Sequence, residues 1–539
     1  MNEMNKQAIT AAKVALEGFH TTPTSLLSYQ SNGHVLVMGD IETLSACKDF
    51  IAPLQMTLLL MKGSFAMPLS DRDIALNQRE IDIKGHLGQF VITLKDARGN
   101  EETLQADLIV DGNVEALLQN EILPAGYFHE IISAETSRQL QDMLVDMTGE
   151  FEKPKYFNYD PSICAHGVNG MTVCMNCIEA CPAGAITSLI EKIEVDPYLC
   201  QGGGSCATVC PSGAIQYVYP TLSDSGNKIR KMLQAFRESG GENPVVVFHA
   251  AEEISEHLAP NYLLVRVEEL ASVGMELCLS TLVYGASQVV LLVDEGMPTM
   301  SISTLNKQLD WLQTLLSGLC LKPLMVSLQN SVSDILPVKN NLQLQPALYS
   351  MPNNKRDALY QAVDHCYQQI NKTRELISLP AGAPFGTAII DESSCTLCMA
   401  CVGACPGKAL QDGSNRELPE LMFIESNCIQ CGTCTQTCPE QAISISPRFI
   451  FNREKRNQSK VLNQDTPFAC ISCGKAFAPT SVIHKMKFKL KGHYMFKTER
   501  ALDRLKMCDD CRVADIVQDP DALNGNYDPL NSTSNNQLS

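Results

Sequence analysis

One cysteine motif occurs twice in succession, as Cys395-Thr-Leu-Cys398-Met-Ala-Cys401-Val-Gly-Ala-Cys405-Pro406 and as Cys428-Ile-Gln-Cys431-Gly-Thr-Cys434-Thr-Gln-Thr-Cys438-Pro439. Runs with this spacing bind iron–sulfur clusters in pairs, because three thiolates hold one cluster and the fourth reaches the other. The repeat therefore predicts a ferredoxin-type module over residues 385–447 with two [4Fe–4S] clusters. The predicted ligands are Cys395, Cys398, Cys401 and Cys438 for one cluster, and Cys428, Cys431, Cys434 and Cys405 for the other.

An altered copy of this framework occurs earlier in the chain, over residues 155–220. It reads Cys164, then Cys174-x2-Cys177-x3-Cys181-Pro182, then Cys200-x5-Cys206-x3-Cys210-Pro211. Met171 stands where the first cysteine of the motif belongs, and Cys164 is the substitute, reached through the longer loop 165–173. The predicted ligands of one cluster in this first module are Cys164, Cys174, Cys177 and Cys210.

The other cluster of the first module has three predicted ligands, Cys181, Cys200 and Cys206, with Gly203 in the place of the middle cysteine. Glycine offers no atom that binds iron. One interpretation is a [3Fe–4S] centre, which needs only three thiolates. A second is a [4Fe–4S] cluster whose fourth iron is held by water, a substrate or a side chain such as His166, and a third is an empty site.

Four cysteines near the C-terminus form a separate arrangement in a unit predicted for residues 465–518. The pairs Cys470-x2-Cys473 and Cys508-x2-Cys511 have the spacing of a tetrahedral zinc site, as in zinc ribbons, and a short helix is expected after Cys511. A further iron–sulfur centre and a site without metal are the alternatives. His484 and His493 lie between the two pairs and are competing ligands. The end of the chain, 519–539, is rich in Asn, Asp and Ser and is predicted to be disordered.

The first 150 residues are expected to form a degenerate Rossmann-like α/β domain. Strands are predicted at 33–39 and 54–61, a helix at 42–51 between them, and further sheet at 81–95 and 108–111. A dinucleotide fingerprint needs three glycines so that the backbone approaches the pyrophosphate closely. The turn Gly39-Asp-Ile-Glu-Thr-Leu44 retains one of them, which favours a structural role over nucleotide binding.

Residues 225–378 alternate between strand and helix patterns, which predicts a doubly wound parallel sheet between the two modules. Strands are expected at 245–248, 262–267, 289–293 and 324–328, and helices from Glu252, at 275–284, at 302–319 and at 355–377. The fold class as a whole is α/β plus α+β. The four remaining cysteines are interpreted as ordinary buried apolar residues without a function: Cys47, Cys278, Cys320 and Cys366.

Composition points to a cytoplasmic redox protein. The net charge of −18 disfavours nonspecific nucleic-acid binding, and no apolar run is long enough to span a membrane. The start of the chain lacks an export signal, and cysteines in metal-binding spacings are typical of a reducing compartment. The basic stretch Lys485–Lys491 contrasts with this acidity. Such a stretch is usually a solvated face, and docking to an acidic redox partner is the alternative.

The arrangement resembles a family of cytoplasmic polyferredoxin-type proteins related to the iron–sulfur subunits of heterodisulfide reductase and hydrogenase complexes. The resemblance rests on the first cysteine framework and on Glu269-Leu-Ala-Ser-Val-Gly-Met-Glu276 followed by Tyr284-Gly-Ala-Ser-Gln-Val-Val-Leu-Leu-Val-Asp294, which is similar to the hydrogenase delta subunit. The N-terminal domain is similar to the flavin-binding part of heterodisulfide reductase A with its phosphate loop lost. The resemblance also extends to proteins associated with formate dehydrogenases.

These features predict an iron–sulfur electron carrier rather than a self-contained enzyme, acting as a subunit or partner of a larger oxidoreductase such as a dehydrogenase or hydrogenase complex. No set of residues resembles a nucleophile with its base, a molybdopterin site or a flavin site. Two alternatives remain open: a flavin-dependent oxidoreductase, and an accessory or maturation factor for a metalloenzyme.

Overall fold

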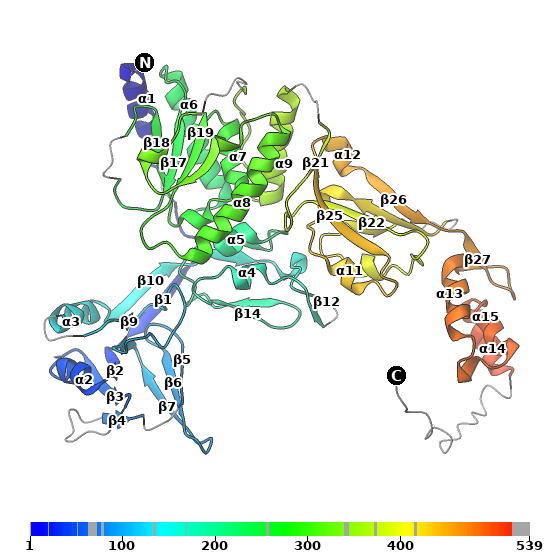
Figure 1. The fold of residues 1–539 in the computed structure, drawn as a ribbon, viewed down its shortest axis with the longest axis horizontal. Coiled ribbons are helices and arrows are strands. Elements are labelled where there is room, and N and C mark those ends of the chain that lie inside the picture. The colour runs from blue at the N-terminus through cyan, green and yellow to red at the C-terminus, as the bar shows by residue number, and fades with distance from the viewer. Residues whose placement is uncertain are drawn as a thin grey trace. The chain divides into compact units, whose positions relative to one another are not determined.

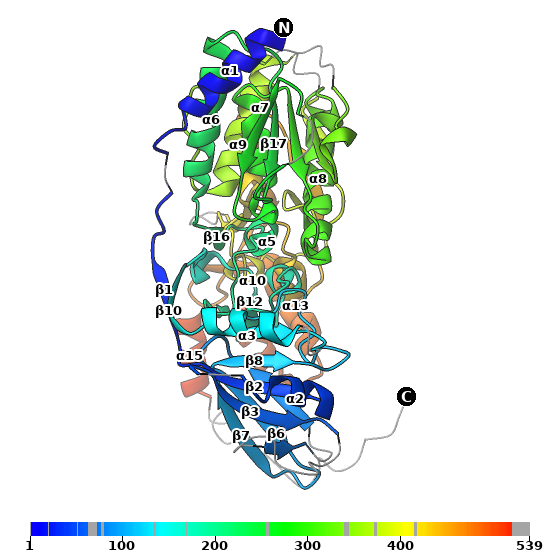
Figure 2. The same cartoon turned by 90° about the vertical axis from the view of Figure 1, so that its left-hand side faces the viewer.

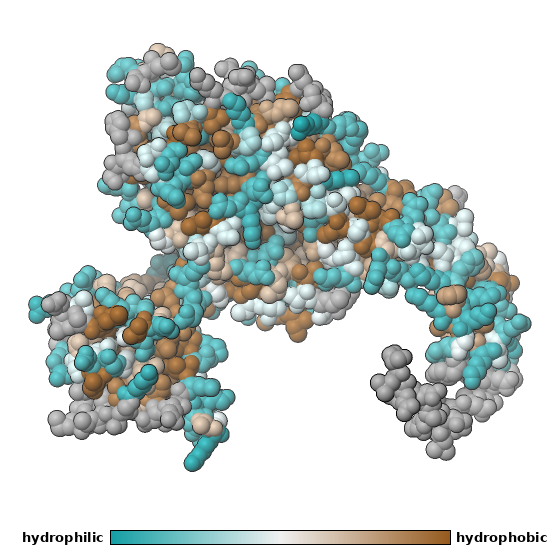
Figure 3. Space-filling model, in the orientation of Figure 1, coloured by the Kyte–Doolittle hydropathy of each residue, from teal (hydrophilic) through white to brown (hydrophobic). Residues whose placement is uncertain are grey.

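The computed structural model describes residues 2–19, 21–50, 52–62, 73–76, 80–132, 136–168, 170–254, 258–338, 344–370, 374–413 and 418–519. Contacts divide the chain into two units, Met1–Ala383 with Phe449–Arg453, and Pro384–Arg448 with Glu454–Ser539 (Figure 1). Within the described ranges, no helix combines the length and the apolar composition needed to cross a bilayer. On the face shown in Figure 3, hydrophobic residues form separate patches among hydrophilic ones. The predicted disordered segment lies outside the described residues, except for Asp519.

The N-terminal part contains a parallel sheet of five strands in the order β4-β3-β2-β8-β9. Its strands are β2 (His34–Gly39), β3 (Gln55–Leu60), β4 (Asp73–Ala75), β8 (Leu108–Asp111) and β9 (Tyr127–His129). Central residues such as Val37 and Leu58 are fully buried, which explains why β2 and β3 were recognisable as apolar runs. Helix α2 (Ile41–Cys47) follows β2 and ends before the predicted Ile51, which itself is outside the described residues.

The predicted sheet segment at 81–95 is a hairpin. Strands β5 (Glu80–Lys84) and β6 (Phe90–Lys95) pair antiparallel, and β7 (Glu101–Ala106) continues the same three-stranded sheet. The turn between β5 and β6 contains Gly85 and Gly88, with φ of 106° and 82°, a conformation that side chains with a Cβ rarely adopt. An antiparallel ribbon of β1 (Leu26–Ser31) and β10 (Gly149–Pro154) leads from this part to the first module.

The first module consists of two short helices and two antiparallel strand pairs. The helices are α4 (Asn176–Glu179) and α5 (Ser205–Val209). The strand pairs are β11 (Phe157–Tyr159) with β16 (Ile215–Tyr217), and β14 (Ile186–Ser188) with β15 (Ile193–Val195). The extra loop after Cys164 forms a small hairpin of β12 (Gly167–Val168) and β13 (Met171–Thr172). The cysteines of the first module other than Cys174 belong to a common core with Ile186, Ile193 and Ile215.

The central part contains a four-stranded parallel sheet in the order β18-β17-β19-β20. The strands are β17 (Val245–His249), β18 (Tyr262–Arg266), β19 (Gln288–Leu292) and β20 (Val326–Gln329). The helices are α6 (Leu222–Glu238), α7 (Met275–Val283), α8 (Thr299–Gly318) and α9 (Lys355–Gln369). Helix α7 contacts α6 and α9, whereas α8 packs on β20. Figure 2 shows helix α1 (Asn2–Val14), which the sequence analysis did not identify, lying along α6.

Three expectations for the central part were wrong. Residues 252–254 are not helical, and the rest of the segment expected to follow Glu252 includes 255–257, outside the described residues. Helix α9 ends at Gln369, because Ile370 turns to extended backbone, and 376–378 form strand β21 (Leu376–Ser378) instead. Cys320 is exposed, since it follows the end of α8 in a left-handed conformation with φ of 57°. Cys47, Cys278 and Cys366 are buried, as expected.

The second unit contains the second module and the C-terminal segment. In the module, β22 (Gly386–Ile390) pairs with β25 (Ile443–Ile450), and a second sheet has the order β23-β24-β26. Those strands are β23 (Leu410–Asp412), β24 (Glu420–Ile424) and β26 (Ser459–Gln464), and the short helices are α10 (Ala400–Gly403) and α11 (Thr433–Thr437). The C-terminal segment forms the hairpin β27 (Pro467–Ala469) and β28 (Ala476–Pro479), then α13 (Thr480–Leu490), α14 (Glu499–Arg504) and α15 (Asp509–Val517).

Candidate metal centres

The cysteine loops of the second module curl because two residues in each loop adopt left-handed backbone. Leu397 and Met399 have φ of 54° and 58°, and Gln430 and Gly432 have φ of 55° and 81° at the corresponding places of the other loop. Such residues reverse the chain direction locally, at an energetic cost for the non-glycine ones. The same left-handed backbone conformation therefore occurs at matching positions in both loops.

The thiols of the second module gather in two groups. Burial raises the pKa of the Cys401 thiol to about 12, and its neighbours Cys395, Cys398 and Cys438 add to the effect. Burial likewise raises the pKa of Cys434, with contributions from a second group of thiols. The largest of these contributions come from Cys431, Cys428 and Cys405, and Cys401 of the first group adds a smaller one. Each group contains the same four cysteines as one predicted ligand set. Thiolates this buried need a compensating cation, which iron supplies.

Each of the four cysteine motifs ends in a cysteine followed by proline and a turn. In three of these four turns, a backbone N–H donates a hydrogen bond to the sulfur of that last cysteine. The backbone N–H of Ala409 donates to Cys405 Sγ at 3.3 Å, and that of Ala442 donates to Cys438 Sγ at 3.3 Å. In the first module the N–H of Ala185 donates to Cys181 Sγ at 3.4 Å. At the fourth place the N–H of Ala214 donates to the hydroxyl of Ser212 instead, which itself lies 3.6 Å from Cys210 Sγ.

Cys164 joins the first thiol group of the first module. Burial raises the pKa of Cys177 to about 12, and Cys210, Cys174 and Cys164 add to it, so the long loop returns to the group that its spacing predicts. His166 anchors this loop, because its Nδ1 lies 2.8 Å from the carbonyl oxygen of Cys174 and its Nε2 lies 2.7 Å from Ser188 Oγ. His166 is therefore beside the group that contains Cys174, and both of its ring nitrogens have hydrogen-bond partners, so neither is available as the ligand missing at Gly203.

The second thiol group of the first module contains Cys206, Cys200 and Cys181. Burial raises the pKa of Cys206 well above its usual value. Cys200 and Cys181 are the next largest causes of this increase. These cysteines line a cavity together with Gly202, Gly203 and Gly204. A Cβ added at Gly203 would have Pro182 Cγ, 3.9 Å away, as its nearest neighbour. The corner of the cavity at Gly203 is thus open space, where the other three loops place a thiol.

The cavity also contains hydrogen-bond donors without acceptors. Gln201 Nε2 and the hydroxyl of Tyr217 are buried, have no partner, and belong to residues that line the cavity. Buried polar atoms in native proteins almost always have a partner, so an unmatched donor calls for an acceptor in the space it faces. The sulfide and thiolate sulfurs of an iron–sulfur cluster are such acceptors. Three thiols, an open corner and two free donors fit a sulfur-rich cluster.

The altered half of the first module lies where the N-terminal and central parts both contact it. From the N-terminal part, Lys153 Nζ donates to the carbonyl oxygens of Tyr198 and Cys200 at 2.8 and 2.7 Å, and burial lowers the pKa of Lys153 to about 8. From the central part, Lys355 Nζ donates to the carbonyl oxygens of Ala207 and Thr208 at 2.8 and 2.7 Å. Both lysines bind the backbone that carries the cysteines, so this site is held from two sides.

The C-terminal cysteines form a site of a different size. The Sγ atoms of Cys470, Cys473, Cys508 and Cys511 all lie within 4.8 Å of one another, and those of Cys473 and Cys508 are 3.7 Å apart. A tetrahedron of sulfurs about 2.3 Å from a central zinc has edges of about 3.8 Å. A four-iron cluster separates its thiolates much further, because the irons lie between them. This geometry fits one tetrahedral ion.

Local contacts prepare this site for a metal. Although burial opposes it, backbone N–H groups of Cys508, Cys473 and Ser472 lower the pKa of Cys470 to about 6, so this residue favours the thiolate form that binds a metal. Among the described residues, neither predicted histidine joins the four: His484 packs edge-on against Phe468, and His493 caps a turn through Met495 N. Helix α15 starts at Asp509 and includes Cys511, one turn earlier than predicted.

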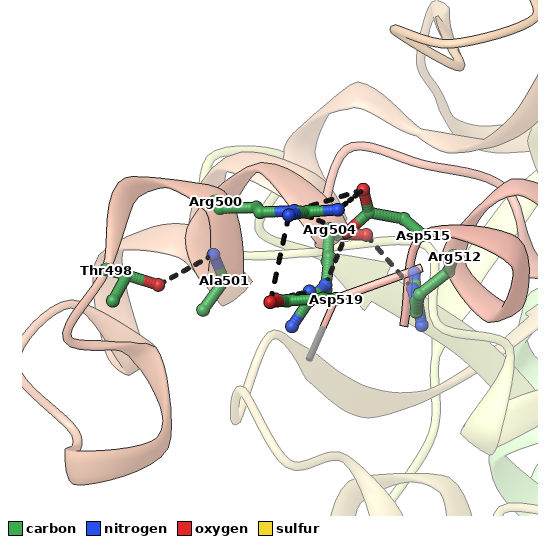
Figure 4. A network of polar contacts seen from close by, with 7 residues as sticks. All are labelled: Thr498, Arg500, Ala501, Arg504, Arg512, Asp515 and Asp519. Atoms are coloured by element: carbon green, nitrogen blue, oxygen red, sulfur yellow. Dashed lines mark hydrogen bonds and ion pairs between the residues drawn. The ribbon is translucent and has the colours of Figure 1, made fainter. Parts of the chain in front are cut away.

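An ion-pair network holds the two helices beside this site together (Figure 4). Arg504 Nε lies 2.6 Å from Asp515 Oδ2, Arg500 Nη2 lies 2.9 Å from Asp515 Oδ1, and both arginines also pair with Asp519. Arg512 Nε donates to the carbonyl oxygen of Arg504 at 3.0 Å. Because α14 precedes Cys508 and α15 contains Cys511, the network joins the two helices that flank the second cysteine pair.

Comparison with protein-family models agrees with the cysteine geometry. A 4Fe–4S dicluster domain model matches residues 394–443, and a 4Fe–4S binding domain model matches residues 193–216, which include Gly203. No curated protein matches the chain. The two matches fall on the second module and on the altered half of the first. The chain is thus an iron–sulfur protein that contains two ferredoxin-type 4Fe–4S regions.

Proposed function

We propose that the protein is an electron carrier that passes single electrons through cysteine-bound clusters, as a subunit or partner of a larger oxidoreductase of the dehydrogenase or hydrogenase kind. The observation that supports this most directly is the second module, where a 4Fe–4S dicluster match coincides with two groups of four thiols. Bound clusters supply reversible one-electron chemistry. The residues of the chain hold the iron, exclude water through burial, and donate hydrogen bonds to sulfur.

The site of Cys181, Cys200 and Cys206 is proposed to hold a [3Fe–4S] centre. The three thiols match the ligand requirement of that centre, and the corner at Gly203 faces only Pro182. The interpretation with four irons requires a ligand from outside the thiol group, and His166 is occupied elsewhere. The remaining three groups of four thiols are proposed to hold [4Fe–4S] clusters. The four C-terminal cysteines are proposed to hold a structural zinc ion, on the strength of their tetrahedral spacing.

The N-terminal part is proposed to be a degenerate Rossmann-like domain with a structural role. Its parallel sheet has the strand–helix start of such a domain, but the Asp40 carboxylate accepts a hydrogen bond from Thr43 N at 2.8 Å. An anion of the chain itself therefore occupies the N-terminus of α2, where the pyrophosphate of a dinucleotide binds in Rossmann folds. This observation supports the electron carrier over the flavin-dependent oxidoreductase.

The test is anaerobic purification, with iron, sulfide, zinc and flavin measured on one sample, followed by EPR of its oxidised and reduced forms. We expect about 15 irons, one zinc, no flavin and a near-isotropic signal in the oxidised state from the three-iron centre. Clusters that are reduced by dithionite and reoxidised by a one-electron acceptor support the carrier. Stoichiometric flavin indicates the oxidoreductase, and clusters that exchange no electrons, together with tight binding to an apo-metalloenzyme, indicate the accessory factor.

A further inference from the structure

The two cluster loops of the second module share their cysteine spacing and their left-handed positions, and two of the side-chain differences between them concern hydrogen-bond donors near sulfur. Leu397 in the first loop corresponds to Gln430 in the second, because each precedes the middle cysteine and both have φ near 55°. Ala400 corresponds in the same way to Thr433, since each precedes the third cysteine. The first loop thus has two apolar residues at the places where the second loop has two hydrogen-bond donors.

Both donors reach a cysteine sulfur. Gln430 Nε2 lies 3.2 Å from Cys428 Sγ and 3.3 Å from the carbonyl oxygen of Thr387, and these two acceptors together define which end of the amide faces them. The hydroxyl of Thr433, which is completely buried, lies 3.2 Å from Cys431 Sγ. Among the residues that the structure describes, no side chain donates a hydrogen bond to the sulfur of Cys395, Cys398 or Cys401.

Two other polar features are the same near both sites. Near each site, two cationic side chains bind one carboxylate. Arg448 and Lys460 bind Glu425, which precedes Cys428 in the sequence. Lys485 and Lys489 bind Glu440, which follows Cys438. The fourth cysteine of each motif accepts the same backbone N–H bond. Gln430 and Thr433 therefore distinguish the side-chain hydrogen bonds to cysteine sulfur at the two sites.

We propose that Gln430 and Thr433 hold the site of Cys428, Cys431, Cys434 and Cys405 at a higher reduction potential than the site of Cys395, Cys398, Cys401 and Cys438. Hydrogen bonds to sulfur raise the potential because they stabilise the extra negative charge of the reduced state. The first site is the more accessible one, since Cys398 is exposed and Cys431 is not. With clusters bound at both sites, an electron from a one-electron donor protein would enter beside Cys398 and would come to rest on the Gln430 side.

The internal step is balanced without any further reactant. The site beside Cys398 gives up one electron, the site beside Cys428 gains the same electron, and no covalent bond or proton is required to change. Water at the exposed Cys398 acts in the opposite direction, because solvent also stabilises the reduced state. The second site has two hydrogen-bond donors fixed within the protein, whereas the first site has solvent at one of its four cysteine sulfurs. We therefore expect the two donors to determine which site has the higher reduction potential. This inference rests on the proposed electron-carrier function.

The pseudo-symmetry of the loops provides reciprocal variants for the test. Gln430→Leu with Thr433→Ala gives the second loop the residues of the first at these two positions, and Leu397→Gln with Ala400→Thr does the opposite. The matched control is Thr435→Ala with Gln436→Leu, on the same helix, where the Thr435 hydroxyl binds the carbonyl oxygen of Gly432 and not a sulfur. Thr433→Ser retains the donor. The measurement is an EPR-monitored redox titration of the full-length protein, with iron and sulfide content determined for each variant.

We expect the first double variant to lower one potential of the second module by at least a tenfold change in the reduction equilibrium, which is 59 mV for one electron. The reciprocal double variant should raise the other potential, while the control and Thr433→Ser should leave both unchanged. Unaltered potentials in both double variants, or shifts as large in the control, would overturn the inference. If one double variant loses its clusters, the other decides. Clusters that cannot be reduced at all would contradict the electron-carrier function instead.

Discussion

Gly203→Cys should convert the proposed three-iron centre of the first module into a four-iron cluster. The change supplies the thiol that the motif lacks, at the position where the other loops have their middle cysteine. Its backbone is not left-handed, and an added Cβ finds its nearest neighbour 3.9 Å away. The adjacent glycines do not offer this freedom: a Cβ at Gly202 would lie 2.9 Å from the Tyr156 ring, and one at Gly204 would lie 2.6 Å from Ser272.

The expected magnitude is one additional iron per protein, from about 15 to about 16, with loss of the near-isotropic signal of the oxidised state. Folding should tolerate the change, because replacing a glycine without strain stabilises a protein by about 0.4–1 kcal/mol through the unfolded chain. The assay is iron and sulfide analysis with EPR of anaerobically prepared protein. Gly203→Ser is the matched control, since its side chain has a similar size and a much poorer iron ligand.

Two results would refute this reasoning. An oxidised-state signal that persists in Gly203→Cys, with unchanged iron content, would mean that residue 203 does not face the open corner. A wild-type protein that already has about 16 irons and no such signal would indicate a four-iron cluster with a ligand from outside the chain. In that second case the cysteine would leave the iron content unchanged and would block the binding of an added thiol or cyanide.

Three further variants test other parts of the structure. Cys164→Ser should perturb one cluster of the first module and leave the second module intact; unchanged iron content and spectra would contradict the ligand role of Cys164. Cys470→Ser should lower zinc content from one to near zero and make residues 465–518 sensitive to proteolysis, because metal binding and folding are coupled in small zinc units; retained zinc would contradict this. Asp515→Asn should speed amide hydrogen exchange in α15. Arg500 and Arg504 lower the pKa of Asp515, so its stabilising effect is present at neutral pH and lost as the pH falls through the folded-state value; exchange rates equal to the wild type at pH 7 would contradict the role of the ion pairs.

The agreement between sequence and structure differs between kinds of element. Strands β2, β17 and β19 lie where their apolar runs predicted, because buried parallel strands have a composition that is visible locally. The predicted end of α9 and the predicted burial of Cys320 were wrong, because the ends of helices depend on how the following residues pack. The sequence analysis did not predict helix α1. This helix packs on α6, more than 200 residues later in the chain, and that contact is not visible in the local sequence.

The cysteine spacing by itself determined the type of site. Short loops constrain where their thiols point, so the pattern of residues 395–439 predicts iron–sulfur ligation without knowledge of the rest of the chain, and Gly203 is visibly a missing ligand. Only the tertiary structure decided what surrounds these ligands. In the folded protein both ring nitrogens of His166 have hydrogen-bond partners. Two cysteine pairs separated by 34 residues have their sulfur atoms within 4.8 Å of one another. The side chains of Gln430 and Thr433 contact cysteine sulfur. The physical reason is that ligand spacing is a short-range property of the backbone, whereas hydrogen bonds and open space around a ligand depend on packing between distant segments.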